Sequence, residues 1–331
     1  MSLRPEALAL FLLAGCGAHE PAPIAFVTNG VDPFWTIAAA GVAAAEAEFG
    51  IRCDVREPEG NTINEQQEIV EDLLSRHVEG IAISPIDAEN EASLIDEACA
   101  KAKVITHDSD APGTQRLCFI GVDNYAAGRL CGQLVAEALP DGGSIVIFIG
   151  RLEQDNSKKR RQGVIDELLG REFAGYDSAD AELEGNGYTI LDTRTDQFDQ
   201  NKAKANAEDA IALYPDLDCM VGLFAYNAPN CLEAVAAAGK LGQIRIVSFD
   251  EQDATLQGIQ DGHIHGTVSQ NPFEYGYHSV RILKALLDGD ESVLPEDAVL
   301  EIEPTVVRQA DVAQFWGELR ARMESGRAKE R

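Results

Sequence analysis

The chain reads Asn29-Gly30-Val31-Asp32-Pro33-Phe34-Trp35 between a short apolar run, at 24–27, and an alanine-rich run, at 36–48. The first run has the length of a buried strand, and the second has high helix propensity. Asp32 can cap the helix, and Pro33 suits the first helical position, where no N–H is needed. Phe34 and Trp35 then lie at the carboxyl end of a strand, where open α/β sheets bind ligands. Although either ring could be an ordinary core residue, two in succession point to different sides of a helix, and we expect at least one to face a cleft.

The rest of the chain repeats this strand-then-helix pattern. Further strands are predicted at 51–56, 80–85, 104–106, 117–122, 144–149, 188–193, 219–224, 244–249, 266–269 and 301–307. Helices are predicted at 63–76, 92–100, 125–139, 162–169, 200–213, 231–238, 254–261 and 274–287. Strands and helices that alternate at this spacing favour parallel sheets with helices on both faces.

This number of strand–helix units is larger than one ordinary doubly wound sheet contains, so we expect two similar lobes. The predicted fold is therefore α/β, with two doubly wound parallel-sheet lobes joined by a multi-strand hinge. We expect crossings near Asp123, at Asn271-Pro272 and at Ile302-Glu303-Pro304. The N-terminal lobe would comprise 24–123 plus 271–302, and the C-terminal lobe 124–270 plus 303–311. The remaining segment, 312–331, is predicted to be a charged, helix-prone tail that docks weakly or frays.

Composition excludes one class of partner. Of the 331 residues, 27 are Lys or Arg and 56 are Asp or Glu, so the formal net charge is −29. A nucleic-acid-binding protein needs a cationic face to displace counterions, and we expect no nucleic-acid partner. Six cysteines follow Cys16 without a C-x-x-C pair, which argues against a zinc site. Their disulfide pairing is left open, and no metal or cofactor is expected.

The N-terminus has the pattern of an export signal. An apolar run at 7–15 is too short to span a bilayer but fits a signal-peptide core, so 1–15 is predicted to be a signal peptide. Leu13-Ala14-Gly15-Cys16 resembles the bacterial lipobox, in which the cysteine is lipidated. The resemblance implies that Cys16 anchors the chain to the membrane through a linker at 16–23, in the periplasm. The alternative is a frayed apolar N-terminus.

Short motifs recur at the predicted strand ends. They are Asp32-Pro33-Phe34-Trp35, Ile81-Ala82-Ile83-Ser84-Pro85, Val104-Ile105-Thr106-His107-Asp108, Gly121-Val122-Asp123-Asn124 with Gly128, Arg160 with Gly163, Phe198-Asp199, Phe224-Ala225-Tyr226-Asn227, Val247-Ser248-Phe249-Asp250 and Ser269-Gln270-Asn271-Pro272. No single motif is specific, but the order in which they occur is. In this order they resemble the motifs of bacterial periplasmic sugar-binding proteins of the ribose-binding type, the type I solute-binding proteins of ABC importers, and the resemblance runs from about Ile24 to Val307.

The resemblance implies a type I periplasmic binding protein fold and a sugar site between the lobes. Carboxylates and amides satisfy sugar hydroxyls, and aromatic faces cover the C–H surface. We expect acceptors at Asp32, Asp108 and Asp250, amides at Asn227 and Gln270, a guanidinium donor at Arg160, and apolar walls at Phe34, Trp35 and Phe198.

Several of these residues have a structural alternative. Asp108, Asp250 and Asn227 could be helix N-caps. Arg160 lies in a basic run that could be a solvated helix face, and Arg161 is its register alternative.

One position departs from the family pattern. Ribose binders usually have Arg after the Asp of the fourth strand, and here Ser109 stands there, so a different pentose, a hexose or a derivative is as good a ligand. His107, just before that Asp, could donate into the pocket but is expected to pack at the strand end.

The function that follows is capture of a monosaccharide for the permease and ATPase of an ABC importer, without catalysis. The alternative is a sugar sensor that presents its ligand to a chemoreceptor or kinase. A sugar-active enzyme is less favoured, because His263 and His265 lack a third metal ligand nearby. A sugar-responsive repressor would need an N-terminal DNA-reading segment and a basic face.

Overall fold

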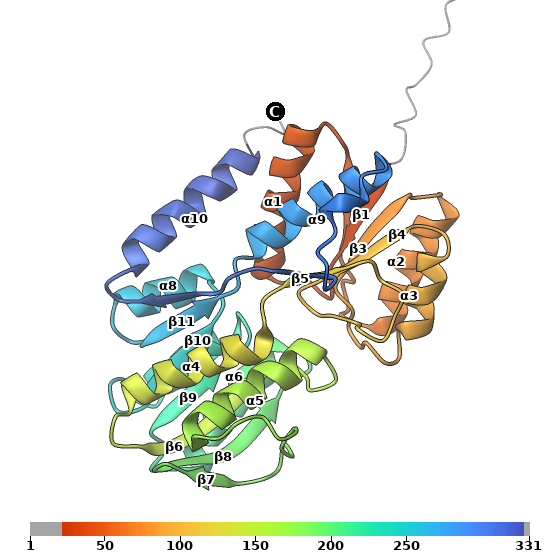
Figure 1. Ribbon diagram of the computed structural model, residues 1–331. Coiled ribbons are helices and arrows are strands. Elements are labelled where there is room, and N and C mark those ends of the chain that lie inside the picture. Colours follow the sequence, from red (N-terminus) through yellow and green to blue (C-terminus); the bar gives the residue numbers. More distant parts are fainter. Residues whose placement is uncertain (1–21, 328–331) are drawn as a thin grey trace, which may run out of the picture.

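The first of two sheets organises the N-terminal lobe of the computed structural model, which describes residues 22–327 (Figure 1). Six parallel strands follow the order β12-β5-β4-β3-β1-β2. They are β1 (Ile24–Val27), β2 (Cys53–Arg56), β3 (Gly80–Ile83), β4 (Lys103–His107), β5 (Phe119–Gly121) and β12 (Val299–Glu301). One face packs on α1 (Pro33–Phe49) and α9 (Pro272–Leu287), and the other on α2 (Ile63–Ser75) and α3 (Ala92–Cys99). Because both faces are covered, β1 and β3 are continuous apolar runs rather than alternating ones.

The C-terminal lobe repeats this plan around a seven-stranded sheet of order β13-β11-β10-β9-β6-β8-β7. Its strands are β6 (Gly143–Ile149), β7 (Leu183–Gly185), β8 (Tyr188–Thr195), β9 (Cys219–Gly222), β10 (Arg245–Phe249), β11 (Gly266–Ser269) and β13 (Thr305–Arg308). The two edge strands, β7 and β13, are antiparallel to their neighbours. Helices α4 (Asn124–Ala138) and α5 (Asp155–Leu169) cover one face. The other face packs on α6 (Gln200–Leu213), α7 (Asn227–Ala237), α8 (Asp253–Gln260) and α10 (Val312–Arg327).

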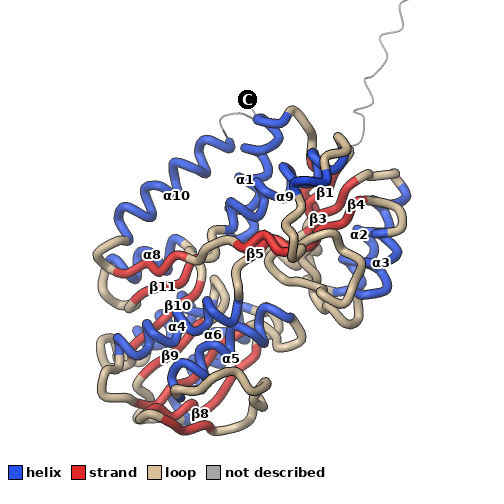
Figure 2. The backbone as a smooth tube through the Cα atoms, viewed as in Figure 1, coloured by secondary structure: helices blue, strands red, loops and turns tan. Residues whose placement is uncertain are grey.

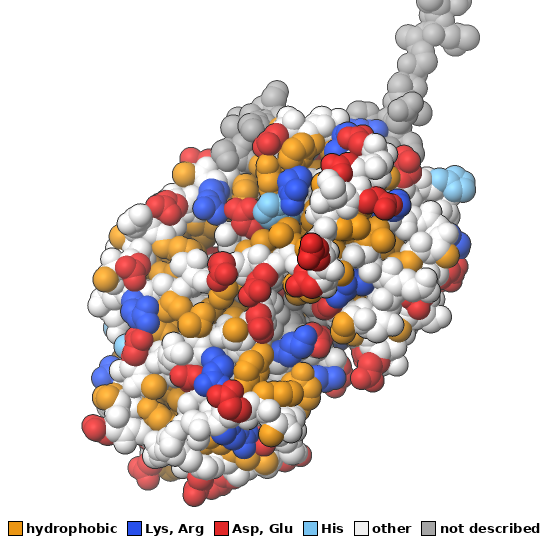
Figure 3. Space-filling view, viewed as in Figure 1, with side chains coloured by type: hydrophobic (Ala, Val, Ile, Leu, Met, Phe, Trp, Pro, Cys, Tyr) orange, Lys and Arg blue, Asp and Glu red, His pale blue; other side chains and the backbone are white. Residues whose placement is uncertain are grey.

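Three short segments join the lobes, at 122–123, 270–271 and 302–304 (Figure 2). A 3₁₀ turn, η1 (Glu291–Val293), precedes the last of them. Acidic side chains gather where the lobes meet on the face shown in Figure 3, and Asp123 and Glu301 line a groove at the hinge. The predicted α/β fold of two doubly wound lobes is confirmed. No helix between residues 22 and 327 is long and apolar enough to cross a membrane.

Some local predictions were wrong. The single strand predicted at 301–307 is two strands, β12 and β13, in different sheets, because the chain crosses between lobes at 302–304. Helix α5 begins at Asp155, ahead of the predicted 162, and the edge strand β7 was not predicted. The disulfide pairing, which the sequence left open, is resolved, because the six cysteines from Cys53 to Cys231 all carry free thiols.

Helices α4 and α5 pack backbone against backbone, which fixes the position of the residues on α5. A Cβ atom on Gly163 would lie 2.2 Å from the carbonyl oxygen of Tyr125. A Cβ atom on Gly128 would lie 2.1 Å from the carbonyl oxygen of Arg160. Only glycine at both places allows this approach, and Arg160 is thereby held at the contact.

The C-terminal helix α10 is a docked element rather than a loose tail. Val312 and Trp316 are buried against the C-terminal lobe, and the Trp316 Nε1–H donates to Asp253 Oδ1 at 2.7 Å. Farther along, Arg322 Nη1 donates to Asn271 Oδ1 at 3.3 Å, and the helix runs beside α1 of the other lobe (Figure 1). The expectation of weak docking or fraying is wrong for this helix, because Trp316 is buried in a core of the C-terminal lobe.

Candidate functional site

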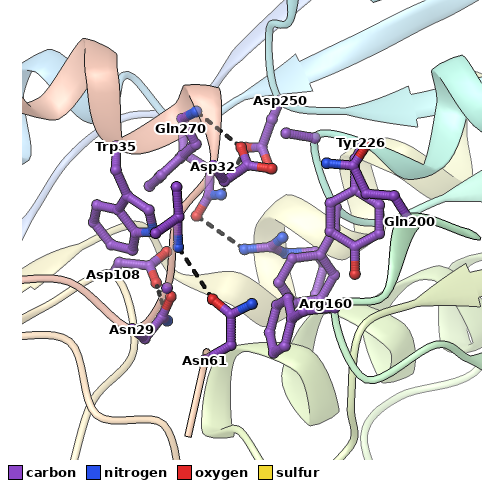
Figure 4. A pocket seen from close by; sticks show the side chains of 16 residues that line it. Asn29, Asp32, Trp35, Asn61, Asp108, Arg160, Gln200, Tyr226, Asp250 and Gln270 are labelled. Atoms are coloured by element: carbon purple, nitrogen blue, oxygen red, sulfur yellow. Dashed lines mark hydrogen bonds between the residues drawn. The ribbon is translucent and has the colours of Figure 1, made fainter. Parts of the chain in front are cut away.

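A cavity lies between the lobes at the carboxyl ends of both sheets (Figure 4). The empty space among its lining residues, including the part that is open to solvent, is about 530 Å³. It is lined by Asn29, Gly30, Val31, Asp32, Phe34, Trp35, Asn61, Asp108, Arg160, Phe198, Gln200, Phe224, Ala225, Tyr226, Asp250 and Gln270. Both lobes therefore supply its walls, as expected where parallel strands end.

Asp108 and Asp250 occupy equivalent places in the two lobes. Asp108 follows β4 with φ 58°, and Asp250 follows β10 with φ 68°. Their backbone N–H groups still donate to the neighbouring strands, at Ile120 O and Val268 O. The left-handed backbone, which Asp tolerates better than most residues, ends each strand and turns the carboxylate into the cavity.

Asp32 both caps α1 and lines the cavity. Its backbone is extended, and Oδ1 accepts from the Phe34 N–H at 2.8 Å. The cap starts the helix directly at the cavity wall, so that Phe34 and Trp35 follow in its first turn. The rings of Phe34 and Trp35 meet edge to face, with centroids 4.8 Å apart.

Arg160 is the most heavily bonded side chain at the site. It is 1% exposed. Its Nε and Nη2 donate to Asn124 Oδ1, Nη1 donates to Leu223 O at 2.7 Å, and Nη2 donates to Gln270 Oε1 at 2.9 Å. The guanidinium also lies 3.9 Å from the ring centroid of Phe249. This network fixes the guanidinium in place before any ligand enters.

Gln270 links that cation to a carboxylate at a crossover between the lobes. Its Nε2 donates to Asp250 Oδ1 at 2.7 Å, while its Oε1 accepts from Arg160. The amide orientation is thus set by two partners of opposite polarity. The geometry of the binding groups is therefore tied directly to the hinge segment at 270–271.

Two aromatic walls face the cavity from opposite lobes. Phe34 and Trp35 come from the N-terminal lobe, and Phe198, Phe224 and Tyr226 come from the other lobe. The Phe198 and Phe224 rings meet edge to face at 5.4 Å. Apolar faces on two sides, with carboxylates and amides between them, match a ligand that has C–H faces and hydroxyl edges.

Burial raises the pKa of the three cavity carboxyls. The pKa of Asp32 rises to about 6 because burial outweighs the hydrogen bonds from Phe34 and Gln252. The pKa of Asp108 rises to about 6 and that of Asp250 to about 7, again through burial, with Arg160 opposing the rise in both. Each carboxylate is costly to keep ionised without a ligand.

Hydrogen bonds bridge the lobes beside the cavity. Asn156 Nδ2, on α5, donates to Asp108 Oδ2 at 3.3 Å. Arg151 Nη2 donates to Asn61 O, also at 3.3 Å, and the Arg151 guanidinium lies 4.6 Å from the Phe198 ring centroid. These contacts hold the two walls together in a closed arrangement.

The structure brings eight of the nine residues predicted for the site around this cavity, namely Asp32, Phe34, Trp35, Asp108, Arg160, Phe198, Asp250 and Gln270. The ninth prediction, Asn227, is not supported, since this residue does not line the cavity. It is the first residue of α7, its Oδ1 accepts from the Phe224 N–H, and its Nδ2 donates to Asp196 Oδ2. Both ends of the amide are used in shaping the turn.

Two alternatives left open by the sequence are also resolved. Arg161 faces away, where its guanidinium donates to Thr193 Oγ1 and to the carbonyl oxygens of Asp177 and Ser178. His107 is fully buried and stacks on Phe26 with ring centroids 4.0 Å apart, so it packs at the strand end.

Five polar or aromatic lining residues were missed by sequence reasoning: Asn29, Asn61, Gln200, Phe224 and Tyr226. Asn29 directly precedes the opening turn, and Phe224 and Tyr226 belong to a motif in which only the Asn was singled out. Asn61 comes from the loop ahead of α2, and no signal in the sequence points to it. No cluster of three His, Cys, Asp or Glu residues within 22–327 could hold a metal ion.

Comparison with known proteins gives matches over most of the chain. The family model described as periplasmic binding protein domain matches residues 24–291. The D-allose-binding periplasmic protein of Escherichia coli is 22% identical, over 82% of this chain and 86% of its own length. The ribose import binding protein of Haemophilus influenzae is 25% identical, over 88% and 95%. A crystal structure of an ABC transporter solute-binding protein from Burkholderia graminis, in complex with D-arabinose, superposes with a TM-score of 0.78 at 26% identity, over 87% and 95%.

Proposed function

Because the chain belongs to the periplasmic binding protein family, we propose that it captures a monosaccharide between its lobes and delivers it to the permease of an ABC importer. One observation carries this proposal: two aromatic walls from different lobes enclose three carboxylates, one guanidinium and several amides in a single cavity. Relatives whose names include ribose import and D-allose binding support the sugar class and the importer. The work is done by binding alone, since a ligand that prefers the closed state shifts the lobes toward it.

The moving bodies in this proposal are 24–123 with 271–302 and 124–270 with 303–311. The ligand roles follow the geometry of the cavity. Asp32, Asp108 and Asp250 accept from hydroxyls, Gln270 accepts and donates, and the aromatic side chains exclude water from the C–H faces. Asn227 does not contact the ligand in this proposal. Tyr226, the residue before it in the same motif, lines the aromatic wall instead.

The proposal is tested by thermal unfolding of the mature chain in the presence of neutral and amino monosaccharides and polyols. At about 100 times its Kd, a ligand adds roughly 2.7 kcal/mol to the free energy of unfolding, which raises Tm by a few degrees. Calorimetry then gives the affinity, and mass spectrometry checks that the sugar is recovered unchanged. If no member of the panel raises Tm or releases heat, the sugar-binding function is wrong, and turnover of any member would favour an enzyme.

Membership of the family places the chain outside the cytoplasmic membrane, and we propose that Cys16 holds it there through a lipid. The lipobox lies outside the described residues, so this part of the proposal rests on the sequence. Mass spectrometry of protein extracted from membranes should find a chain that begins at Cys16, with residues 1–15 removed and a lipid on Cys16. The Cys16→Ala variant should leave the membrane fraction, and an unlipidated Cys16 in membrane-derived protein would rule the anchor out.

A further inference from the structure

The charges that face the cavity do not balance. Asp32, Asp108 and Asp250 are its acidic side chains, and Arg160 is the single cationic one among the residues that line it. With all four groups ionised, the formal charge is 1 − 3 = −2. A buried excess of this kind is costly unless a ligand compensates it.

Arg160 cannot serve as that compensation at close range. A guanidinium has five N–H groups, and four of them donate to Asn124, Leu223 and Gln270. None of these bonds goes to a carboxylate. Arg160 therefore acts on Asp108 and Asp250 through space, and it offers little to an anionic ligand.

The hydrogen bonds to the carboxylates come from neutral groups and fall on one oxygen of each pair. Asp108 Oδ2 accepts from Asn29, Ser84 and Asn156, and Asp250 Oδ1 accepts from Gln270. Asp108 Oδ1 and Asp250 Oδ2 are left for the ligand. These two oxygens come from opposite lobes, so a donor that reached both would hold the cavity closed.

We propose that the ligand of this cavity is a cationic sugar or polyol, carrying a protonated amine that pairs with Asp32, Asp108 and Asp250. This inference rests on the proposed function and narrows its ligand class. A protonated amine supplies donors and a positive charge and has no acceptor, which is what the oxygens facing the cavity require. Burial raises the pKa of all three carboxyls, and the positive charge of the ligand would offset the free-energy cost of ionising them.

The test compares amino sugars with their neutral parents on the same protein. Three matched pairs are used: D-glucosamine with D-glucose, D-galactosamine with D-galactose, and 1,4-dideoxy-1,4-imino-D-ribitol with 1,4-anhydro-D-ribitol. By calorimetry near pH 6, the amine of at least one pair should bind about tenfold or more tightly than its neutral parent, because a hydrogen bond between charged groups is stronger than one between neutral groups. Binding should also release protons, seen as a dependence of the heat on the buffer, because the cation favours ionised carboxylates.

A matched pair of variants separates charge from capping. Asp32→Asn keeps an N-cap on α1 but removes one carboxylate from the cavity, and it should reduce the preference for the amine severalfold. Asp123→Asn makes the same change at the N-cap of α4, which does not line the cavity, and it should leave the preference unchanged. If neutral sugars bind as well as or better than their amines in every pair, the cationic ligand is wrong and the sugar function stands. If neither class binds, the sugar function itself fails.

Discussion

Replacing Arg160 by methionine tests whether this guanidinium organises the site. The substitution removes four donated hydrogen bonds and leaves Leu223 O, Asn124 Oδ1 and Gln270 Oε1 without that donor in a buried place. An unsatisfied buried acceptor costs about 1–3 kcal/mol, and removing one partner from a buried charged network costs roughly 3–5 kcal/mol. We expect the free energy of unfolding to fall by about 3–5 kcal/mol, as measured by urea unfolding.

Ligand affinity should fall as well, by about a hundredfold or more. Gln270 loses the partner that orients it toward Asp250, and the pKa of both Asp108 and Asp250 rises further once the opposing charge is gone. Calorimetry with whichever sugar binds the wild type measures this loss. If the methionine variant does not fold, Arg160→Lys keeps the charge, loses the fork and serves in its place.

Arg161→Met is the matched control. Arg161 is 3% exposed and also donates three hydrogen bonds, but to Thr193, Asp177 and Ser178, away from the cavity. The Arg161→Met variant should lose a similar amount of free energy of unfolding and keep its affinity for the ligand. Equal loss of binding in the two variants, or full binding by Arg160→Met, would refute the role given to Arg160.

Three further predictions follow from the packing and the titration of the site. Gly163→Ala places a Cβ 2.2 Å from Tyr125 O and should lower the free energy of unfolding by roughly 1–3 kcal/mol. Gly317 is exposed inside α10, and nothing lies within 4 Å of an added Cβ, so Gly317→Ala should raise the free energy of unfolding by about 0.5–1 kcal/mol through its higher helix propensity. A loss of equal size in both variants by urea unfolding would contradict this. The pKa of Asp250 is raised from 3.8 to about 7 in the folded state, so its contribution to stability is present in acid and is lost as pH rises through this range. Asp250→Asn lacks that loss, so the stability of the variant relative to wild type should increase from near pH 4 to near pH 7; a constant difference would refute the shift. Trp316→Ala removes a buried ring and its bond to Asp253 and should cost about 3 kcal/mol; an unchanged Tm by calorimetry would show that α10 adds no stability.

The parts of the site that could be predicted are those fixed by local sequence. Asp32 caps α1 because an extended residue before Pro33 leaves its side chain near the next N–H groups, whatever the rest of the fold does. Asp108 and Asp250 follow apolar strands, and parallel strands end at one edge of a sheet. Neither inference needs to know which lobe packs against which.

The parts that failed depend on contacts distant in sequence. Asn227 was assigned to the cavity, yet its partner Asp196 lies on another segment and cannot be found from the motif itself. Arg160 was placed in the cavity correctly, but the sequence kept Arg161 as its register alternative, and the Gly163 contact, which sets the rotation of α5, decides between them. Asn61 and Tyr226 come from loops of different lobes, and local sequence does not show that both line one cavity.

Helix α10 has a consequence for how this molecule opens. Its Trp316 is seated on one lobe, while its Arg322 reaches Asn271 in the second crossover. Rotation of the lobes changes the span between these two points, so the helix must travel with one half and slide over the other. In the proposed binding cycle, the ratio of open to closed molecules therefore depends on a contact remote from the cavity. We expect substitutions along this helix to change ligand affinity even though every residue that lines the cavity stays the same.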